Sequence, residues 1–395
     1  MNKDPAGKIR IEKLTLIVLA VSALVFIVLF MWARPEKSEP LEASEYVEYE
    51  KAEVTGILSD NTEIDPASDN AYRGEQLLTA IVKTGRYKDE ELLVYNYTGP
   101  LYGVPVSEGD SIIISISTHA DGQHNAVVYE YNRIPALAIV IIIFCIFTVL
   151  IGGKTGLKSL IGLLFTILCL FTILIPMLLK GAPTLPATFL MCSYIALVSF
   201  VILGGVHRKT ISAFLGTFAG PALAMIFGLI AQYASRINGL RISDVEPLLQ
   251  LRQSGTPIGL SGLLVAGIII SALGAVMDVS MSISSALEEV HQANPELTAR
   301  QLFRSGMNIG RDMAGTMTNT LILAFLGSSF TLIIYLYSLD LGFYQFFSSA
   351  YLAIEVISGI SSSIGMILAI PLTALISSLL MSGDKSSDLS GTRPA

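Results

Sequence analysis

Apolar residues in this chain gather into runs long enough to cross a lipid bilayer, which requires about 20 residues of helix. We predict eight spanning helices, over residues 14–32, 134–151, 157–179, 185–205, 211–232, 258–280, 313–338 and 350–380. Basic residues precede the first run, as in a secretory signal. That run is too long for a signal and ends without a small-residue cleavage site, so it predicts a retained signal anchor.

Between the first two runs the pattern changes to short segments rich in β-branched and aromatic residues. Clusters such as Ser59-Asp60-Asn61 separate them, as turns separate strands. The five segments cover residues 54–58, 76–83, 91–97, 111–117 and 126–131. Strands of this number and length predict a small all-β domain, an OB-like barrel being one form.

A second turn cluster, Ala120-Asp121-Gly122, precedes the last predicted strand. His119, Asp121 and His124 flank it and are candidates for metal ligands. However, Asp-Gly is a hairpin signal in its own right, which favours a plain turn. We therefore expect neither a metal site nor a cofactor.

The chain is thus predicted to be an α-helical polytopic membrane protein in four segments. A signal anchor occupies residues 1–33, and an extracytoplasmic β domain with an acidic stem occupies 34–133. A seven-helix membrane domain follows over 134–380, and a cytoplasmic tail over 381–395 is predicted to be disordered.

Composition supports this class, with 52% hydrophobic residues, 14% charged residues and a mean hydropathy of +0.63. Soluble domains do not show this balance. Acidic side chains outnumber basic ones more than two to one between Arg34 and Arg133, so the negative charge concentrates in the exported domain. The cysteines, Cys145, Cys169 and Cys192, lie in apolar runs and indicate no disulfide framework.

Lysine and arginine are enriched in the loops that would face the cytoplasm, such as the His207-Arg208-Lys209 loop. This bias predicts a multi-pass membrane protein with both termini inside. The loop over residues 233–257 is an exception to this bias, because it is predicted to be outside and yet carries Arg236, Arg241 and Arg252. We interpret part of it as an amphipathic segment on the outer surface.

Only the last three apolar runs have acidic residues in the span or at its edge, namely Asp278, Asp312 and Glu355. A carboxylate in hydrocarbon costs roughly 2.5–3.5 kcal/mol, so it persists where it faces protein, water or a passing ion. Asp278 and Asp312 lie at span ends, where a charge can simply mark the membrane boundary. Glu355 lies inside its run and is harder to explain in that way.

Asp278 belongs to a polar stripe on one helical face, formed by Gly274, Asp278, Ser282, Ser285 and Glu289. We expect this stripe to face protein rather than lipid. After it, Asn294 and Pro295 predict the start of a separate cytoplasmic helix over residues 295–308.

In the seventh run, Asp312, Thr316 and Asn319 converge on one side of the helix. A carboxylate, a hydroxyl and an amide together suit a small cation or a polar substrate. The structural alternative is that Arg311 pairs locally with an acid at the membrane interface.

The last run is too long for a straight crossing, because 31 residues reach roughly 46 Å against a core of about 30 Å. Its middle, from Glu355 to Gly365, is dense in glycine and serine. This composition indicates either close helix packing or an unwound stretch such as binds substrate in transporters. Gly216 and Gly220 form a further close-packing motif.

Two stretches carry a family resemblance, Gly274-Ala275-Val276-Met277-Asp278-Val279-Ser280 and Gly310-Arg311-Asp312-Met313-Ala314-Gly315-Thr316-Met317-Thr318-Asn319. They resemble the YibE/F-like family of bacterial membrane proteins. The exported domain and its closing Tyr131-Asn132-Arg133 are similar too. The resemblance implies the architecture and a place in the bacterial cell (cytoplasmic) membrane, and it names no substrate.

The sequence has no phosphate-binding loop, no GxSxG and no HExxH, so we expect neither an enzyme nor catalytic residues.

Three functions remain open. The first is a transporter or permease of an unknown small solute or ion, coupled to protons or cations through the acidic residues. The second is a non-transporting scaffold or sensor whose β domain binds a partner. The third is a permease driven by a partner ATPase. Convergence of the acidic residues on one cavity would favour transport. No nucleic-acid partner is indicated.

The predicted topology is tested by labelling single cysteines in intact cells. A cysteine at Asp69 should react with an impermeant reagent and one at Ser386 should not, because the first is outside and the second inside. Labelling at position 386 would exclude this orientation.

Overall fold

A computed structural model describes residues 5–34, 46–118, 124–237 and 245–382. The long helices are α1 (Pro5–Ala33), α2 (Ile134–Cys169), α4 (Thr184–Gly204), α5 (Arg208–Ala234), α7 (Leu263–Ala293), α8 (Ala299–Ser328) and α11 (Ala350–Ser382). Shorter ones are α3 (Ile175–Leu179), α6 (Glu246–Gln253), α9 (Phe330–Ser338) and α10 (Phe343–Phe347). The strands are β1 (Tyr46–Asp60), β2 (Glu63–Asp65), β3 (Ala71–Val82), β4 (Glu91–Thr98), β5 (Ser111–Thr118) and β6 (His124–Tyr131).

Contacts divide the chain into two compact units. One contains Glu36–Leu150, and the other contains Met1–Pro35 and Ile151–Ala395. The first half of α2 thus groups with the β domain, unlike the boundary at residue 134 that we predicted. The polar tail lies outside the described residues.

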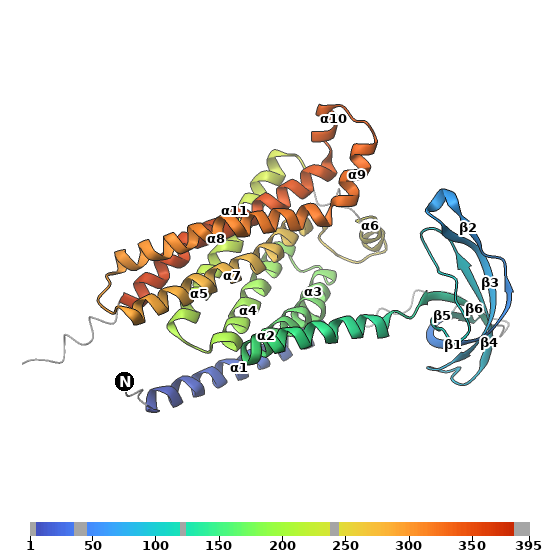
Figure 1. Cartoon of the computed structure of the whole chain (residues 1–395), viewed down its shortest axis with the longest axis horizontal. Helices are drawn as coiled ribbons and strands as arrows, with labels where there is room; N and C mark the ends of the chain where they lie inside the picture. Colours follow the sequence, from blue (N-terminus) through green and yellow to red (C-terminus); the bar gives the residue numbers. More distant parts are fainter. Residues whose placement is uncertain (1–4, 35–45, 119–123, 238–244, 383–395) are drawn as a thin grey trace, which may run out of the picture. The chain divides into compact units, whose positions relative to one another are not determined.

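The β unit is a closed barrel (Figure 1). Its strand order is β1-β5-β6-β4-β3-β2, and β1 also pairs with β3, which closes the sheet. β4 and β6 run parallel, whereas the other pairs are antiparallel. The predicted acidic stem and the turn at Ala120-Asp121-Gly122 fall largely or wholly outside the described residues. The stem's last part, from Tyr46, forms the start of β1.

The barrel interior follows from the alternation of side chains along each strand. In β5, Ile112, Ile114 and Ile116 are fully buried, whereas their neighbours are less so. Two polar side chains share this interior. The Asn96 Nδ2 atom and the Val106 amide both donate to the Gln76 Oε1 atom at 2.9 Å, which fixes the loop before β5 against the barrel.

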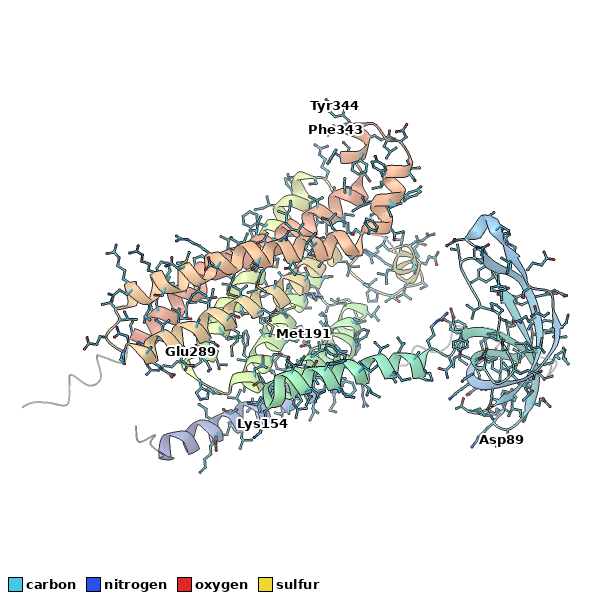
Figure 2. The ribbon with its side chains drawn as sticks, in the orientation of Figure 1. Asp89, Lys154, Met191, Glu289, Phe343 and Tyr344 are labelled. Carbon is cyan, nitrogen blue, oxygen red and sulfur yellow. The ribbon has the colours of Figure 1, made fainter. Side chains whose placement is uncertain are left out.

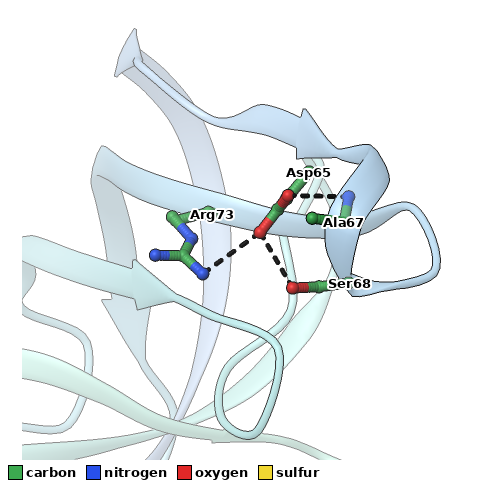
Figure 3. A network of polar contacts seen from close by, with 4 residues as sticks. All are labelled: Asp65, Ala67, Ser68 and Arg73. Carbon is green, nitrogen blue, oxygen red and sulfur yellow. Dashed lines mark hydrogen bonds and ion pairs between the residues drawn. The ribbon is translucent and has the colours of Figure 1, made fainter.

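An aspartate cap organises the turn between β2 and β3 (Figure 3). The Asp65 carboxylate accepts from the Ser68 hydroxyl at 2.8 Å and the Ala67 amide at 3.0 Å, and it pairs with Arg73 at 3.1 Å. The hydrogen bonds from Ser68 and Ala67 hold the pKa of Asp65 below its ordinary value. The cap therefore stabilises the turn above that ordinary pKa, and the contribution is lost as the pH falls through the lowered pKa of the folded state.

The helical unit is built around α5, α7 and α11, which lie against one another (Figure 1). Small residues allow these helices to approach closely. A Cβ atom added at Gly216 would lie 2.0 Å from the Thr373 Oγ1 atom, and one at Gly365 would lie 2.8 Å from the Gly220 carbonyl oxygen. The GxxxG motif of α5 is thus a packing motif here. Small residues allow such contacts in membranes, where apolar side chains gain little by leaving lipid.

Buried hydroxyl pairs join the same three helices. Ser271 and Ser362 lie 2.7 Å apart, and Ser280 and Thr373 lie 3.0 Å apart. A chain of hydrogen bonds runs from Ser212 of α5 through Ser284 of α7 to Ser377 of α11. These pairs fix the rotation of each helix about its axis, so they also determine which face of each helix points outward.

The glycine- and serine-rich stretch of α11 is therefore packing rather than a break. The helix is continuous from Ala350 to Ser382, and Ser361, Ser362 and Ser363 are buried within it. Of the two alternatives for this stretch, the structure supports close packing.

Helix α8 also differs from the prediction of a separate cytoplasmic helix over residues 295–308. Thr298 and Gln301 form a capping box, so the helix begins at Ala299, and it continues without a break to Ser328. Asn294 instead accepts a hydrogen bond from the Glu296 amide in a turn. The prediction was wrong because the capping box is a stronger helix start than Asn294 with Pro295.

The structure supports fewer membrane spans than the eight predicted. Among the described residues, six helices are long and apolar enough to cross a membrane, or seven if α8 and α9 form one bent span. These two helices meet at an angle of 60° after Ser328, whose hydroxyl bonds to the Phe325 carbonyl oxygen and so competes with the helix. Residues 134–179 count as one run of 46 residues, interrupted at Gly153, whose φ is +54°.

Part of the loop predicted to lie on the surface is helical. α6 is short, has no buried residue and begins with Glu246.

Helix α1 packs within the helical unit, because the Tyr194 hydroxyl donates to the Ser22 carbonyl oxygen at 2.6 Å and Lys180 Nζ donates to the Trp32 carbonyl oxygen at 2.7 Å.

The close packing predicts opposite results for two glycine substitutions. Gly365→Ala should destabilise the protein, because the new methyl would meet backbone of α5 that cannot move aside. Gly267→Ala, on an open face of α7 with nothing within 4 Å, should be neutral or stabilise by up to about 1 kcal/mol. Thermal unfolding in detergent measures both, and equal melting temperatures for the two variants would contradict the packing.

Candidate functional site

The polar stripe of α7 points away from α5 and α11, and Gly274 and Asp278 of this stripe lie opposite α2 and α4. Gly274, Asp278, Ser282 and Glu289 are exposed. In Figure 2, Glu289 projects from the end of α7. The reason is that α7 packs through its opposite face, where Ser280 and Ser284 bond to α11. The stripe therefore lines the space on the side of α7 that points away from α11.

Asp278 lines a cavity of about 330 Å³ between α2, α4 and α7. The second half of α2 and the turn that follows it form one wall, α4 forms another, and Gly274 with Asp278 lies on the α7 side. Because Gly274 and Asp278 are exposed, they form the mouth of this cavity.

Three hydroxyl groups share the cavity with the carboxylate, those of Ser159, Thr166 and Ser199. The Thr166 hydroxyl donates to the Gly162 carbonyl oxygen at 2.9 Å, so its oxygen remains able to accept. Ser199 is only 3% exposed, and its Oγ atom has no hydrogen-bond partner among the described residues. Buried polar atoms are usually paired, so an unpaired one beside a cavity indicates room for a polar ligand or water.

A π-helical turn, η2 (Leu170–Leu174), supplies part of the same wall. Pro176 follows it and lacks the amide proton that a regular helix would direct at the Thr172 carbonyl oxygen. The wider turn accommodates this loss. Such turns often occur at functional sites.

Glu355 lines a different cavity, of about 250 Å³, between α11 and the bend that joins α8 to α9. Apart from Ser329, the other lining side chains are apolar, and the ring of Phe325 lies near Gly359. Glu355 is half-buried there. The cavity therefore places one carboxyl group against an almost wholly apolar wall.

The two cavities lie at different levels of the helical unit. Ser271 pairs with Ser362 and Ser280 pairs with Thr373, so α7 and α11 run in the same direction. By this register Asp278 lies opposite residue 371, which is roughly 24 Å along the helix from Glu355.

Asp312, Thr316 and Asn319 share a face of α8, but this face is exposed and lines neither cavity. The opposite side of α8 packs on α7 and α11 through Gly306 and Gly310. Within one chain, the structure brings Asp278 together with hydroxyl groups of α2 and α4, and not with Asp312 or Glu355.

The hydroxyl groups of Ser159, Thr166 and Ser199 were not candidates from the sequence. Each is a single small polar residue in an apolar run, and such residues occur in many spans without a function. The signal that identifies them is the shared cavity, which requires knowledge of how α2, α4 and α7 pack.

The described residues contain no group of three or more histidine, cysteine, aspartate or glutamate side chains that could hold a metal ion. Asp278 is accordingly the only carboxylate in its cavity.

The model of one protein family, the YibE/F-like proteins, matches residues 140–383. The chain belongs to the YibE/F-like family. The match runs from within α2 to the end of α11, so it covers the part of the helical unit that holds both cavities, and it covers neither α1 nor the barrel. No curated protein and no solved structure matches the chain.

Proposed function

We propose that this YibE/F-like protein is a membrane transporter or permease, and that the Asp278 cavity binds its ion or solute. The observation that carries the proposal is the carboxylate at the mouth of a cavity lined by Ser159, Thr166 and Ser199. Asp278 lies near the middle of α7, at a depth where a carboxylate is costly unless it faces water or a cation.

The chemistry of the lining favours a proton or a small monovalent cation as the coupling species. One carboxylate and neutral hydroxyl oxygens offer a single negative charge. Divalent ions in proteins are usually held by more carboxylates than this. A solute with an ammonium group would meet the same requirement.

The architecture that we propose has eight spans with both termini inside. A run of 46 residues would reach roughly 69 Å as one helix, more than twice a bilayer core, and Gly153 is the point at which it can divide. We also propose an OB-like barrel outside, because the strand order, the closure by β1 and the parallel pair of β4 with β6 agree with that topology.

Glu355 is then a second protonatable group, near the other side of the membrane. Its separation from Asp278 along the helices suits alternating access, in which one group is reached from each side. The two groups line separate cavities, so we propose that transport proceeds by a change in helix packing rather than through an open channel.

A non-transporting scaffold or sensor is the alternative. It is favoured by the acidic residues' failure to converge in one chain, and by the exposed polar face of α8, which suits a protein partner better than a solute. A partner ATPase that docks on the exposed Gln301 and Arg304 is a further variant.

Reconstitution in vesicles tests the Asp278 site. Asp278→Asn should abolish proton- or cation-driven uptake, because it removes the only charge in the cavity, whereas Glu289→Gln should leave uptake unchanged. Glu289 is the matched control, since it lies on the same stripe of α7 and does not line the cavity. Equal activity of both variants and the native protein would remove Asp278 from the mechanism.

Ser199→Ala separates a ligand-binding role from a structural one. Since its hydroxyl has no partner, its loss should leave the melting temperature unchanged or slightly higher. If the hydroxyl binds the ion or solute, the apparent affinity should fall about tenfold, as expected for one hydrogen bond of roughly 1–1.5 kcal/mol. An unchanged affinity would mean that this wall of the cavity does not contact the ligand.

Glu355→Gln should reduce uptake while the protein remains folded and inserted. The reason is that it removes the only carboxyl group in its cavity. Uptake by reconstituted vesicles provides the test. A Gln variant with native uptake would favour the scaffold alternative.

A further inference from the structure

The outward face of α8 is polar at a depth where its neighbour α11 exposes apolar side chains. The exposed residues on it are Asn308, Arg311, Asp312, Gly315, Thr316 and Asn319. Arg311 donates to the Asn308 Oδ1 atom at 3.4 Å. The Asp312 carboxylate has no hydrogen-bond or ion-pair partner within the part of the chain that the structure describes.

The contacts of α8 fix this depth. Gly310 packs against Ile370 of α11, and Gly306 packs against Ala374. At about the same levels α11 exposes Ile367 (40%) and Leu375 (46%), as a lipid-facing helix does. Arg311 and Asp312 are therefore level with apolar surface, and Asn319 lies deeper still.

Lipid cannot be the neighbour of this face without a large cost. Charged side chains in hydrocarbon cost roughly 2.5–3.5 kcal/mol each on insertion scales. The side-chain amide of Asn319, which has no hydrogen-bond partner among the described residues, adds to this cost. Something polar must cover the face in the membrane.

A glycine on the same face indicates that the cover is another helix. Gly306 and Gly310 are explained by packing within the chain, because a Cβ atom at either would lie 3.0 Å or less from a neighbouring side chain. A Cβ atom at Gly315 would meet nothing within 4 Å. An exposed glycine flanked by Thr316 and Asn319 matches the surfaces by which membrane helices approach closely and exchange hydrogen bonds.

We propose that this face of α8 binds the same face of a second copy of the chain. The charges are self-complementary, because Arg311 and Asp312 are adjacent and so lie at nearly the same depth. A two-fold axis along the membrane normal would set Arg311 of each copy beside Asp312 of the other. Neighbours in sequence do not face each other on a helix, so the pair forms between copies and not within one.

Charge exchange between two copies tests the pairing directly. Arg311→Asp and Asp312→Arg should each weaken the dimer, raising its dissociation constant at least about tenfold through like-charge contact. Co-expression of the two single variants should restore a mixed dimer, because each of its two contacts would again join an acidic side chain of one copy to a basic side chain of the other. The readout is co-purification of two different tags.

Failure of the mixed dimer to form, with both variants folded by thermal unfolding, would overturn the pairing. So would a native protein that is monomeric by light scattering in detergent and in nanodiscs. A stable complex with a different protein through this face would equally overturn it.

Disulfide crosslinking tests the geometry independently, in a chain whose three cysteines are replaced by alanine. Cysteines at Thr316 and Asn319 should crosslink two copies under mild oxidation. Cysteines at Met317, which packs against the bundle, and at the lipid-facing Leu375 should not. Crosslinking of equal yield at all four positions would indicate random collision and contradict the interface.

Discussion

The close approach of α5, α7 and α11 is the constraint on which the helical unit depends. Lipid is as apolar as leucine, so these helices gain little from burying apolar side chains and must instead gain from close contact and hydrogen bonds. Gly216, Gly220 and Gly365 permit the contact, and the hydroxyl pairs of Ser271, Ser280 and Ser284 fix the register. Substituting these residues would change the rotation of α7, and with it the direction in which Asp278 points.

The remaining polar residues are distributed as a consequence. Because α7 presents its serine-bearing face to α11, the stripe with Asp278 points away from the three-helix core and meets the wall of α2 and α4. Because α8 presents Gly306 and Gly310 inward, Asp312 and Asn319 point away from the chain. One packing arrangement thus produces a cavity on one helix and an unpartnered polar face on the next.

The fold class and the family could be predicted from the sequence, since span length, the strand segments and the stretches around Asp278 and Asp312 are local signals. The direction in which Asp278 faces could not be predicted, because helical periodicity gives the residues of a stripe but not the neighbours that the stripe faces. We expected the stripe to face protein, but which helices it faces follows from Ser280 and Ser284, whose hydroxyls direct the other side of α7 to α11. The start of α8 was missed because Asn294 with Pro295 resembles a cap, while the capping box begins at Thr298. The hydroxyls of Ser159, Thr166 and Ser199 had no sequence signal at all.

The positions of the acidic residues bear on what the functional unit is. In one chain, Asp278 and Glu355 line separate cavities and Asp312 faces outward, so these three acidic residues do not share one cavity. A second copy against α8 would bury Asp312 without bringing it to either cavity. Under this arrangement the α8 face holds two copies together, and each copy keeps its own Asp278 site. A substitution that breaks the α8 contact would then abolish the dimer and leave ligand binding at Asp278 unchanged. This result distinguishes a transporter made of two independent units from one whose path runs between the two copies.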